Sequence, residues 1–221
     1  SVTKTFEIVY METESDEKDT SNTQYYSPTG IQGNNGYYTS DVTIVAKEGY
    51  ELVNDKEEKL SSGITITEEG KHTVSFRTRR LADGALSDQI TLEIRIDKSM
   101  PTGTIEMNEK TWDTFLSKIT FGLYNVNNYA VTLTAADEAS GVEKIEFVVS
   151  EKAYASIKEL EADDLKWKTY SETFKPTLNP DKNQIIYVRL TDKAGNVSYI
   201  SSDGIVVDTT APTISNVYIK E

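Results

Sequence analysis

Cysteine is absent from the 221-residue sequence, and histidine occurs once. Without cysteine the chain can form neither a disulfide nor a thiolate zinc site, and it has no thiol nucleophile. The one histidine, His72, lies in the hairpin-like stretch "EEGKHTVSF". We therefore expect an ordinary strand-edge residue there rather than the base of a Ser-His-Asp triad. Carboxylate chemistry is the one catalytic class that remains open.

Excess positive charge and long apolar runs are also lacking. The net charge is −13, whereas nucleic acid and anionic membranes are bound by Lys/Arg surfaces. No stretch has the apolar length of a membrane span, and the first residues show no signal peptide. We expect a monomer with no nucleic-acid partner and no membrane insertion.

Apolar residues alternate with polar ones in short runs, which indicates strands with one buried face. Gly-containing turns such as "EEGK", "ADGA", "ASGV" and "KAGN" separate the runs. The inward faces are predicted to consist of Val42, Ile44, Ala46, Val74, Phe76, Ile90, Leu92, Ile94 and Ile96 in the first half, and of Val131, Leu133, Ala135, Ile145, Phe147, Val149, Ile186, Val188, Leu190, Ile205 and Val207 in the second. This pattern predicts an all-β fold of antiparallel sheets packed face to face.

One segment departs from the alternation. "SEKAYASIKELEADD" (150–164) is rich in helix formers, and Tyr154, Ile157 and Leu160 fall at helical spacing. With Ser150 as its cap, it is predicted to be a short helix between two strands of the second sandwich.

A short sequence motif near the centre of the chain recurs at its end. Asp97 stands four residues before Pro101-Thr102, and Asp208 stands four residues before Pro212-Thr213. The two copies are separated by about 110 residues, which is about the length of one small sandwich domain. The aspartate is expected to accept hydrogen bonds from the following backbone, and the proline to keep the connection stiff.

The repeat divides the chain into two modules, predicted at 25–99 and 100–209. Residues 1–24 form a leading segment that is either a first strand or the end of a preceding module. Residues 210–221 are predicted to be a linker and the first strand of a next module.

The closing stretch "LTDKAGNVSYISSDGIVVDTTAPTI" resembles the last strands of bacterial immunoglobulin-like repeat modules of Gram-positive surface proteins, and "IDKSMPTGTI" resembles the same junction. The resemblance implies two tandem immunoglobulin-like β-sandwiches in a secreted or cell-wall-attached protein. It further implies a non-catalytic spacer or stalk whose partners are the neighbouring domains of the same polypeptide.

Binding is the alternative class of function. Tyr37, Tyr38 and Trp112 could form an aromatic platform for a glycan, as in an adhesin, and a host surface protein is the other candidate ligand. Tyrosine is also a common strand residue and tryptophan a core anchor.

Calcium is the one candidate cofactor, and otherwise none is expected. Acidic residues near turns supply the oxygen ligands that calcium prefers, although EF-hand spacing is absent. The candidates are Asp137, Glu138, Asp192, Asp203 and Asp208. Catalysis by a pair of carboxylates is a further hypothesis, although clustered acids in a helix or tail are usually solvated. A covalent Lys–Asn cross-link between strands is another.

Overall fold

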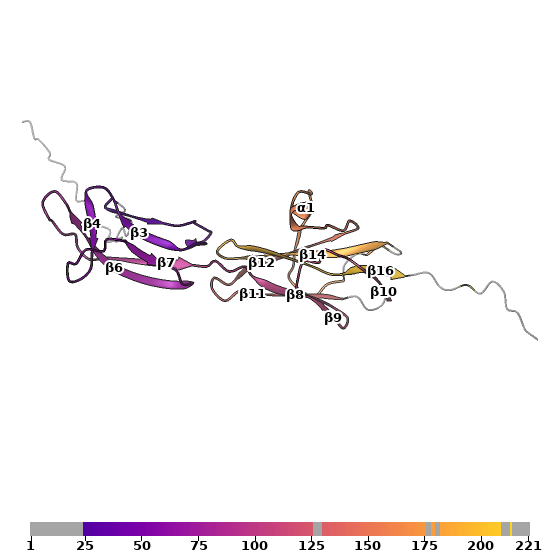
Figure 1. The fold of residues 1–221 in the computed structure, drawn as a ribbon. Coiled ribbons are helices and arrows are strands. Elements are labelled where there is room, and N and C mark those ends of the chain that lie inside the picture. Colours follow the sequence, from indigo (N-terminus) through magenta and orange to yellow (C-terminus); the bar gives the residue numbers. More distant parts are fainter. Residues whose placement is uncertain (1–23, 126–129, 176–177, 180–181, 209–212, 214–221) are drawn as a thin grey trace, which may run out of the picture.

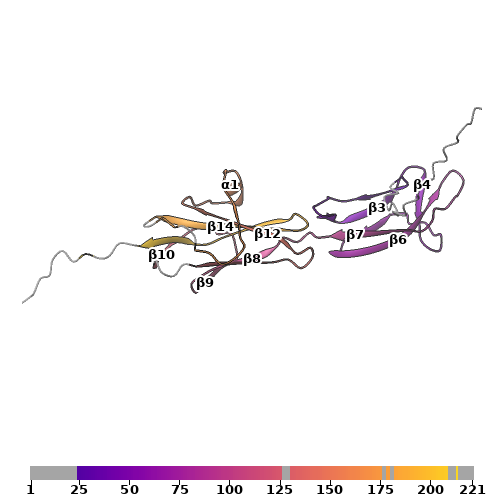
Figure 2. The ribbon, with the colours of Figure 1, turned by 180° about the vertical axis from the view of Figure 1, so that it is seen from behind.

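The computed structural model describes residues 24–125, 130–175, 178–179, 182–208 and 213, which form two β-sandwiches lying end to end (Figure 1). Figure 2 shows the same arrangement from behind. The predicted leading segment and the predicted strand of a next module lie outside the described residues, apart from residues 24 and 213. Among the described residues, no helix is long and apolar enough to cross a membrane.

The first module consists of a three-stranded and a four-stranded sheet. In spatial order, the strands are β1 (Tyr26–Thr29), β3 (Val42–Ala46) and β5 (Ile64–Ile66) in one sheet, and β2 (Tyr37–Tyr38), β7 (Ile90–Ile96), β6 (Gly70–Arg80) and β4 (Tyr50–Val53) in the other. Tyr26 and Ile44 from one sheet pack with Phe76 and Ile96 from the other in a single buried cluster. The first module is therefore a β-sandwich with its own core.

The second module repeats this plan with longer strands. One sheet contains, in spatial order, β11 (Val131–Ala136), β8 (Thr102–Met107) and β9 (Lys110–Trp112). The other contains β10 (Phe121–Asn125), β16 (Gly204–Asp208), β14 (Asn183–Asp192), β12 (Val142–Ser150) and β13 (Lys168–Thr169), and β15 (Val197–Ser201) also pairs with β14. Ile105 and Leu133 from the first sheet pack with Val188 and Ile205 from the second, so this module also has a separate core.

The structure confirms the all-β fold and the inward faces that alternation predicts. All of the predicted inward residues are buried or packed against one of the two cores. Among the described strands, two pairings are parallel and the others are antiparallel. In the first module β2 pairs in parallel with β7, and in the second β10 pairs in parallel with β16. Each module thus ends on a strand with a parallel partner from earlier in the chain.

Strand β14 contradicts the expectation of one polar face per strand. Ile186 and Val188 face the core, but Ile185 and Tyr187 on the opposite face are fully buried as well. A third cluster, in which Tyr154 is also buried, covers that outer face. Figure 1 shows the connection that carries α1 on this side of the sheet. Alternation does not reveal this covering layer, because it comes from a distant segment.

The predicted helix is present but much shorter than residues 150–164. Helix α1 spans Ile157–Glu161, and its N-cap is Ser156 rather than Ser150. Ser156 Oγ accepts the Glu159 amide at 3.3 Å, while the Glu159 carboxylate accepts the amide of Ala155 at 3.0 Å. These two bonds fix the start of the helix in a variant of the capping box, because the carboxylate reaches the residue before the cap rather than the cap itself. Ser150 instead ends β12, where it pairs with Ile185.

Candidate functional site: the junction between the modules

Five residues, 97–101, connect the last strand of the first module to the first strand of the second. The Asp97 amide donates to Tyr38 O at 2.9 Å, and Asp97 Oδ1 accepts the Ser99 amide at 3.1 Å. The aspartate thus fixes a turn in the backbone that follows it, as predicted. For the second copy, residues 209–212 lie outside the described residues, and nothing is described of the Asp208 side chain.

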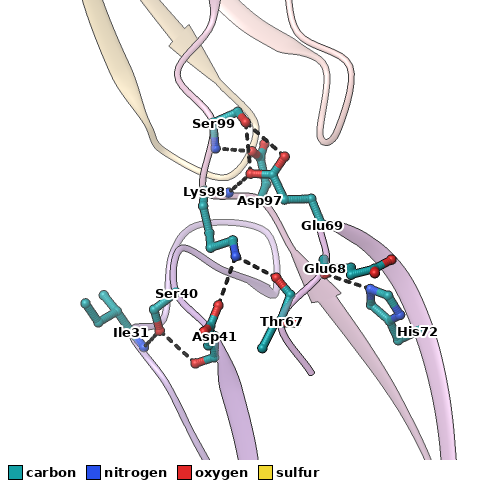
Figure 3. Close-up of polar contacts among 10 residues, drawn as sticks. All are labelled: Ile31, Ser40, Asp41, Thr67, Glu68, Glu69, His72, Asp97, Lys98 and Ser99. Carbon is teal, nitrogen blue, oxygen red and sulfur yellow. Dashed lines mark hydrogen bonds and ion pairs between the residues drawn. The ribbon is translucent and has the colours of Figure 1, made fainter. Parts of the chain in front are cut away.

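Glu69 and Lys98 hold this segment against the first module (Figure 3). One carboxylate oxygen of Glu69 accepts the Lys98 amide at 2.7 Å, and both oxygens lie 2.9 Å from the Ser99 hydroxyl that donates to them. The Lys98 ammonium donates to Asp41 Oδ1 at 2.9 Å and to Thr67 O at 2.6 Å. The first three residues of the connection are therefore attached to the module that it leaves.

On the other side, the connection is attached to the second module. Pro101 is buried, and its carbonyl oxygen accepts a hydrogen bond from the Ser198 hydroxyl. Thr102, the first residue of β8, follows directly, and its Oγ1 donates to Ala136 O of the paired strand β11 at 3.4 Å. Because proline fixes its own φ and restricts the residue before it, few backbone rotations remain free between these attachments.

The two modules also contact each other directly. The Asn34 amide donates to Ala194 O at 2.7 Å, and the side-chain amide of Asn35 donates to Lys193 O at 2.8 Å. In the opposite direction, Asn196 Nδ2 donates to Asp97 O at 3.2 Å. A loop of the first module thus lies against the turn between β14 and β15 of the second.

Glycine permits this close approach. A Cβ atom at Gly33 would lie 2.3 Å from Ala194 O, and one at Gly195 would lie 2.8 Å from Asn34 Nδ2. Distances below 3.0 Å are too short for a carbon atom, so any side chain at Gly33 would force the backbones apart.

Three carboxylates converge at the same junction. Asp97 follows β7, Asp137 follows β11, and Asp192 ends β14. One carboxylate oxygen from each lies within 4.8 Å of the others. Asp97 and Asp192 are fully buried, and Asp137 is half-buried.

Backbone amides orient two of these carboxylates. Asp137 Oδ1 accepts the amides of Ser140 and Gly141 at 2.9 and 2.7 Å. In the same way, Asp192 Oδ1 accepts the amides three and four residues further on, at 2.7 and 2.9 Å. Both turns hold an aspartate in place by hydrogen bonds from the chain that follows it.

Asp97 differs from the other two because its Oδ2 is buried without a hydrogen-bond partner. Desolvation by burial raises the pKa of the Asp97 carboxyl, and the neighbouring Ser140 hydroxyl partly offsets this. The negative charges of Asp137 and Asp192 raise the same pKa further. A carboxylate in this position is destabilised unless a positive charge compensates it.

A groove on the surface leads to the half-buried carboxylate. It is lined by Glu69, Ser99, Met100, Thr102 and residues 136–139, which include Asp137 and Glu138. The groove therefore runs between the first module and the turn after β11, and its wall is acidic.

The calcium candidates do not all lie in one place in the fold. The structure brings Asp137 and Asp192 together, with Glu138 exposed beside them. Asp203 accepts hydrogen bonds from the Thr120 amide and hydroxyl, and the adjacent Ser202 pairs with Ile186. Ile186 lies six residues along β14 from Asp192, which is roughly 20 Å. Asp203 is therefore far from Asp137 and Asp192. Asp208 lies at the end of β16, still further away.

Asp97 was not among the calcium candidates predicted from the sequence. It is the residue that completes the acidic group and the one that belongs to the first module. The signal in the sequence was that Asp97, like Asp192, ends an apolar strand. Which strand ends meet depends on the sheet order and on the docking of the modules, and neither is visible in the alternation.

The predicted aromatic platform is split between the modules. Tyr37 and Tyr38 form β2 of the first module, and Tyr38 packs against that module's core. Trp112 ends β9 of the second module and packs against the other core. Glycan binding by these residues stays a prediction, and the packing of two of them against separate cores does not favour it.

His72 and the lysines lie in positions that do not favour catalysis or a cross-link. His72 lies in β6 with its Nε2 atom 2.8 Å from Glu68 O, in the hairpin predicted for it. In the described part of the chain every lysine is exposed, so none lies in a core as a strand-to-strand cross-link would require.

The chain is similar to known proteins both in sequence and in fold. A protein-family model described as a domain of unknown function (DUF7743) matches residues 111–220, which lie mostly in the second module. The comparison with curated proteins gives no match. Among solved structures, the chain is similar to the fibronectin(III)-like modules of CbhA from Clostridium thermocellum, with 14% identity and a TM-score of 0.38 over 86% of this chain and 100% of that chain.

Proposed function

We propose that the protein is a non-catalytic spacer, in which tandem immunoglobulin-like modules hold the neighbouring domains of a longer polypeptide at a fixed separation. The observation that carries this proposal is the junction. Two separate sandwiches are joined by five residues that are hydrogen-bonded to both modules, and Asn34 and Asn35 add direct contacts between them.

A junction of this kind differs from an ordinary linker between domains. Gly/Ser linkers behave as flexible coils, and relative motion is the usual expectation for domains that share only a small interface. Here Glu69, Lys98 and Ser198 fix the connection at both ends. The sandwiches lie in line rather than side by side (Figures 1 and 2). This arrangement gives the greatest separation for a given chain length.

The proposed setting is the outside of a bacterial cell, in a secreted or wall-attached protein. The resemblance of the closing strands to surface-protein modules supports this setting, and so does the acidic composition. A net charge of −13 keeps neighbouring copies of a stalk from adhering to one another. A glycan or a host surface protein would be the ligand under the adhesin alternative.

Double electron–electron resonance on the full chain would test the spacer. Because the sequence has no cysteine, two introduced cysteines can be spin-labelled without background. Thr73→Cys in β6 and Glu106→Cys in β8 are exposed positions in different modules. Thr73 lies opposite Glu93, so the labelled backbones are no more than about 45 Å apart at 3.3 Å per residue.

A rigid spacer gives one narrow distance distribution, and inserting Gly-Ser-Gly-Ser between Ser99 and Met100 should broaden it. The inserted variant is the matched control because both modules keep all of their core residues. A wild-type distribution as broad as that of the insertion variant would show that the junction is flexible and would contradict the proposal.

A further inference from the structure

We propose that Asp97, Asp137 and Asp192 form a calcium-binding site that links the two modules. One ligand comes from the end of the first module, and two come from turns of the second. The ion would therefore bridge the modules directly. The binding of calcium does not depend on the spacer function, although a bridged junction would serve a spacer well.

The charges around the site favour a cation. Within the described part of the chain, the three carboxylates accept hydrogen bonds from backbone amides, the Ser140 hydroxyl and the Asn196 amide, and from no lysine or arginine. Of the flanking lysines, Lys98 is paired with Asp41. The exposed Lys193 lies near the site, with its ammonium 3.6 Å from where a Cβ atom at Gly141 would stand, but it forms no ion pair with the three carboxylates among the described residues. Glu69 and Glu138 in the adjacent groove add negative charge.

The unpaired oxygen of Asp97 is the second, independent observation. In folded proteins almost every buried polar atom has a partner, and an orphan requires an explanation. The Oδ2 atom of Asp97 is such an orphan, in a side chain with no exposed surface. A bound metal ion would supply the missing partner and would offset the repulsion from Asp137 and Asp192.

The ligand chemistry points to calcium rather than to a transition metal. All three ligands are carboxylate oxygens, and zinc sites use histidine or cysteine. Calcium binds oxygen at about 2.3–2.6 Å, so oxygens up to about 4.8 Å apart can share one ion. Magnesium requires shorter contacts of about 2.0–2.1 Å in an octahedron. Water entering through the groove beside Asp137 would complete the coordination.

Isothermal titration of the full chain with CaCl2, after removal of divalent ions with EDTA, tests this proposal. We expect saturable binding of one ion. Thermal unfolding followed by circular dichroism should show a Tm about 5–10 °C higher when calcium is about 100-fold above its Kd.

Asp97→Asn is the informative variant. The asparagine keeps an oxygen to accept the Ser99 amide, so the turn should persist, but it removes the charge at the site. We expect the calcium heat and the Tm shift to be lost. In EDTA its Tm should equal or exceed that of the wild type, because a buried unpaired charge has been removed. Asp137→Asn provides a second variant that retains the backbone hydrogen bonds.

Asp164→Asn is the matched control, because Asp164 is highly exposed and pairs with Lys166 away from the junction. It should respond to calcium as the wild type does. Absence of calcium binding in the wild type would overturn the proposal, and so would a full response in both Asp97→Asn and Asp137→Asn. Equal stabilisation by MgCl2 would overturn the assignment to calcium. The resonance experiment on the junction does not depend on any of these results.

Discussion

Gly33→Ala should separate the two modules without unfolding either. Gly33 does not have a positive φ, so alanine can adopt its backbone conformation. Within the first module, the added Cβ meets the Thr39 methyl group at 2.9 Å, and a side chain can move away from such a contact. Across the interface it would lie 2.3 Å from Ala194 O, and that backbone can move only if the modules separate.

The size of the effect follows from the bonds that would be lost. Relieving the contact requires an opening of roughly 1 Å, which breaks the hydrogen bond from Asn34 to Ala194 and the one from Asn35 to Lys193. At about 1 kcal/mol each, their loss shifts the balance between docked and undocked modules by about 2 kcal/mol. That energy corresponds to a roughly 30-fold change in the equilibrium.

The spin-label pair at positions 73 and 106 measures this change. We expect the distance distribution of Gly33→Ala to broaden, while the unfolding transition of each module remains within about 1 kcal/mol of the wild type. Adding Thr39→Ser to Gly33→Ala relieves only the contact inside the first module, so the broadening should persist in the double variant. An unchanged distribution in Gly33→Ala would refute the reasoning that the loop contact holds the modules together.

Three further predictions concern the modules themselves. Tyr187→Phe leaves the buried amide of Tyr154 without its 3.0 Å acceptor, so urea unfolding should show the second module destabilised by about 1–3 kcal/mol. Ser156→Ala should destabilise the same module by about 0.5–2 kcal/mol in that assay, and Ser150→Ala should leave α1 unaffected. Burial raises the pKa of Asp203, but hydrogen bonds from neighbouring amide and hydroxyl groups outweigh it, so the folded pKa lies below the ordinary 3.8. Ionised Asp203 therefore stabilises the folded protein. This stabilisation is complete above the pKa of Asp203 in the unfolded state and is lost as the pH falls through its pKa in the folded state. Asp203→Asn should flatten the acid limb of the stability profile measured by urea unfolding.

The sequence predicted most of the features that depend on near neighbours. Alternation placed Val42 and Ile44 on the inner face of β3, and the turn role of Asp97 followed from the residues next to it. The limits appeared where distant segments meet. The burial of Tyr187 depends on a connection that packs over the outer face of β14, and the pattern of the strand itself contains no sign of that cover.

At the candidate site too, the sequence pattern did not predict which distant residues meet. Asp137 and Asp192 were predicted as candidates because they stand near turns, and so was Asp203, which lies in a different place in the fold. What separates them is the sheet order and the docking of the second module on the first. Asp97 joins the group only because both modules are present, so the sequence of a single module could not have revealed it.

The parallel pairings affect how the protein would respond to pulling. The chain leaves the first module through β7, which is hydrogen-bonded to β6 on one side and to β2 on the other. Tension transmitted through residues 97–101 acts along the axis of β7, so the hydrogen bonds on its two sides are loaded in shear and share the force. Strand β16 has the same position between β10 and β14 in the second module. A tether built in this way would resist extension at both exits, because no row of bonds can open one at a time.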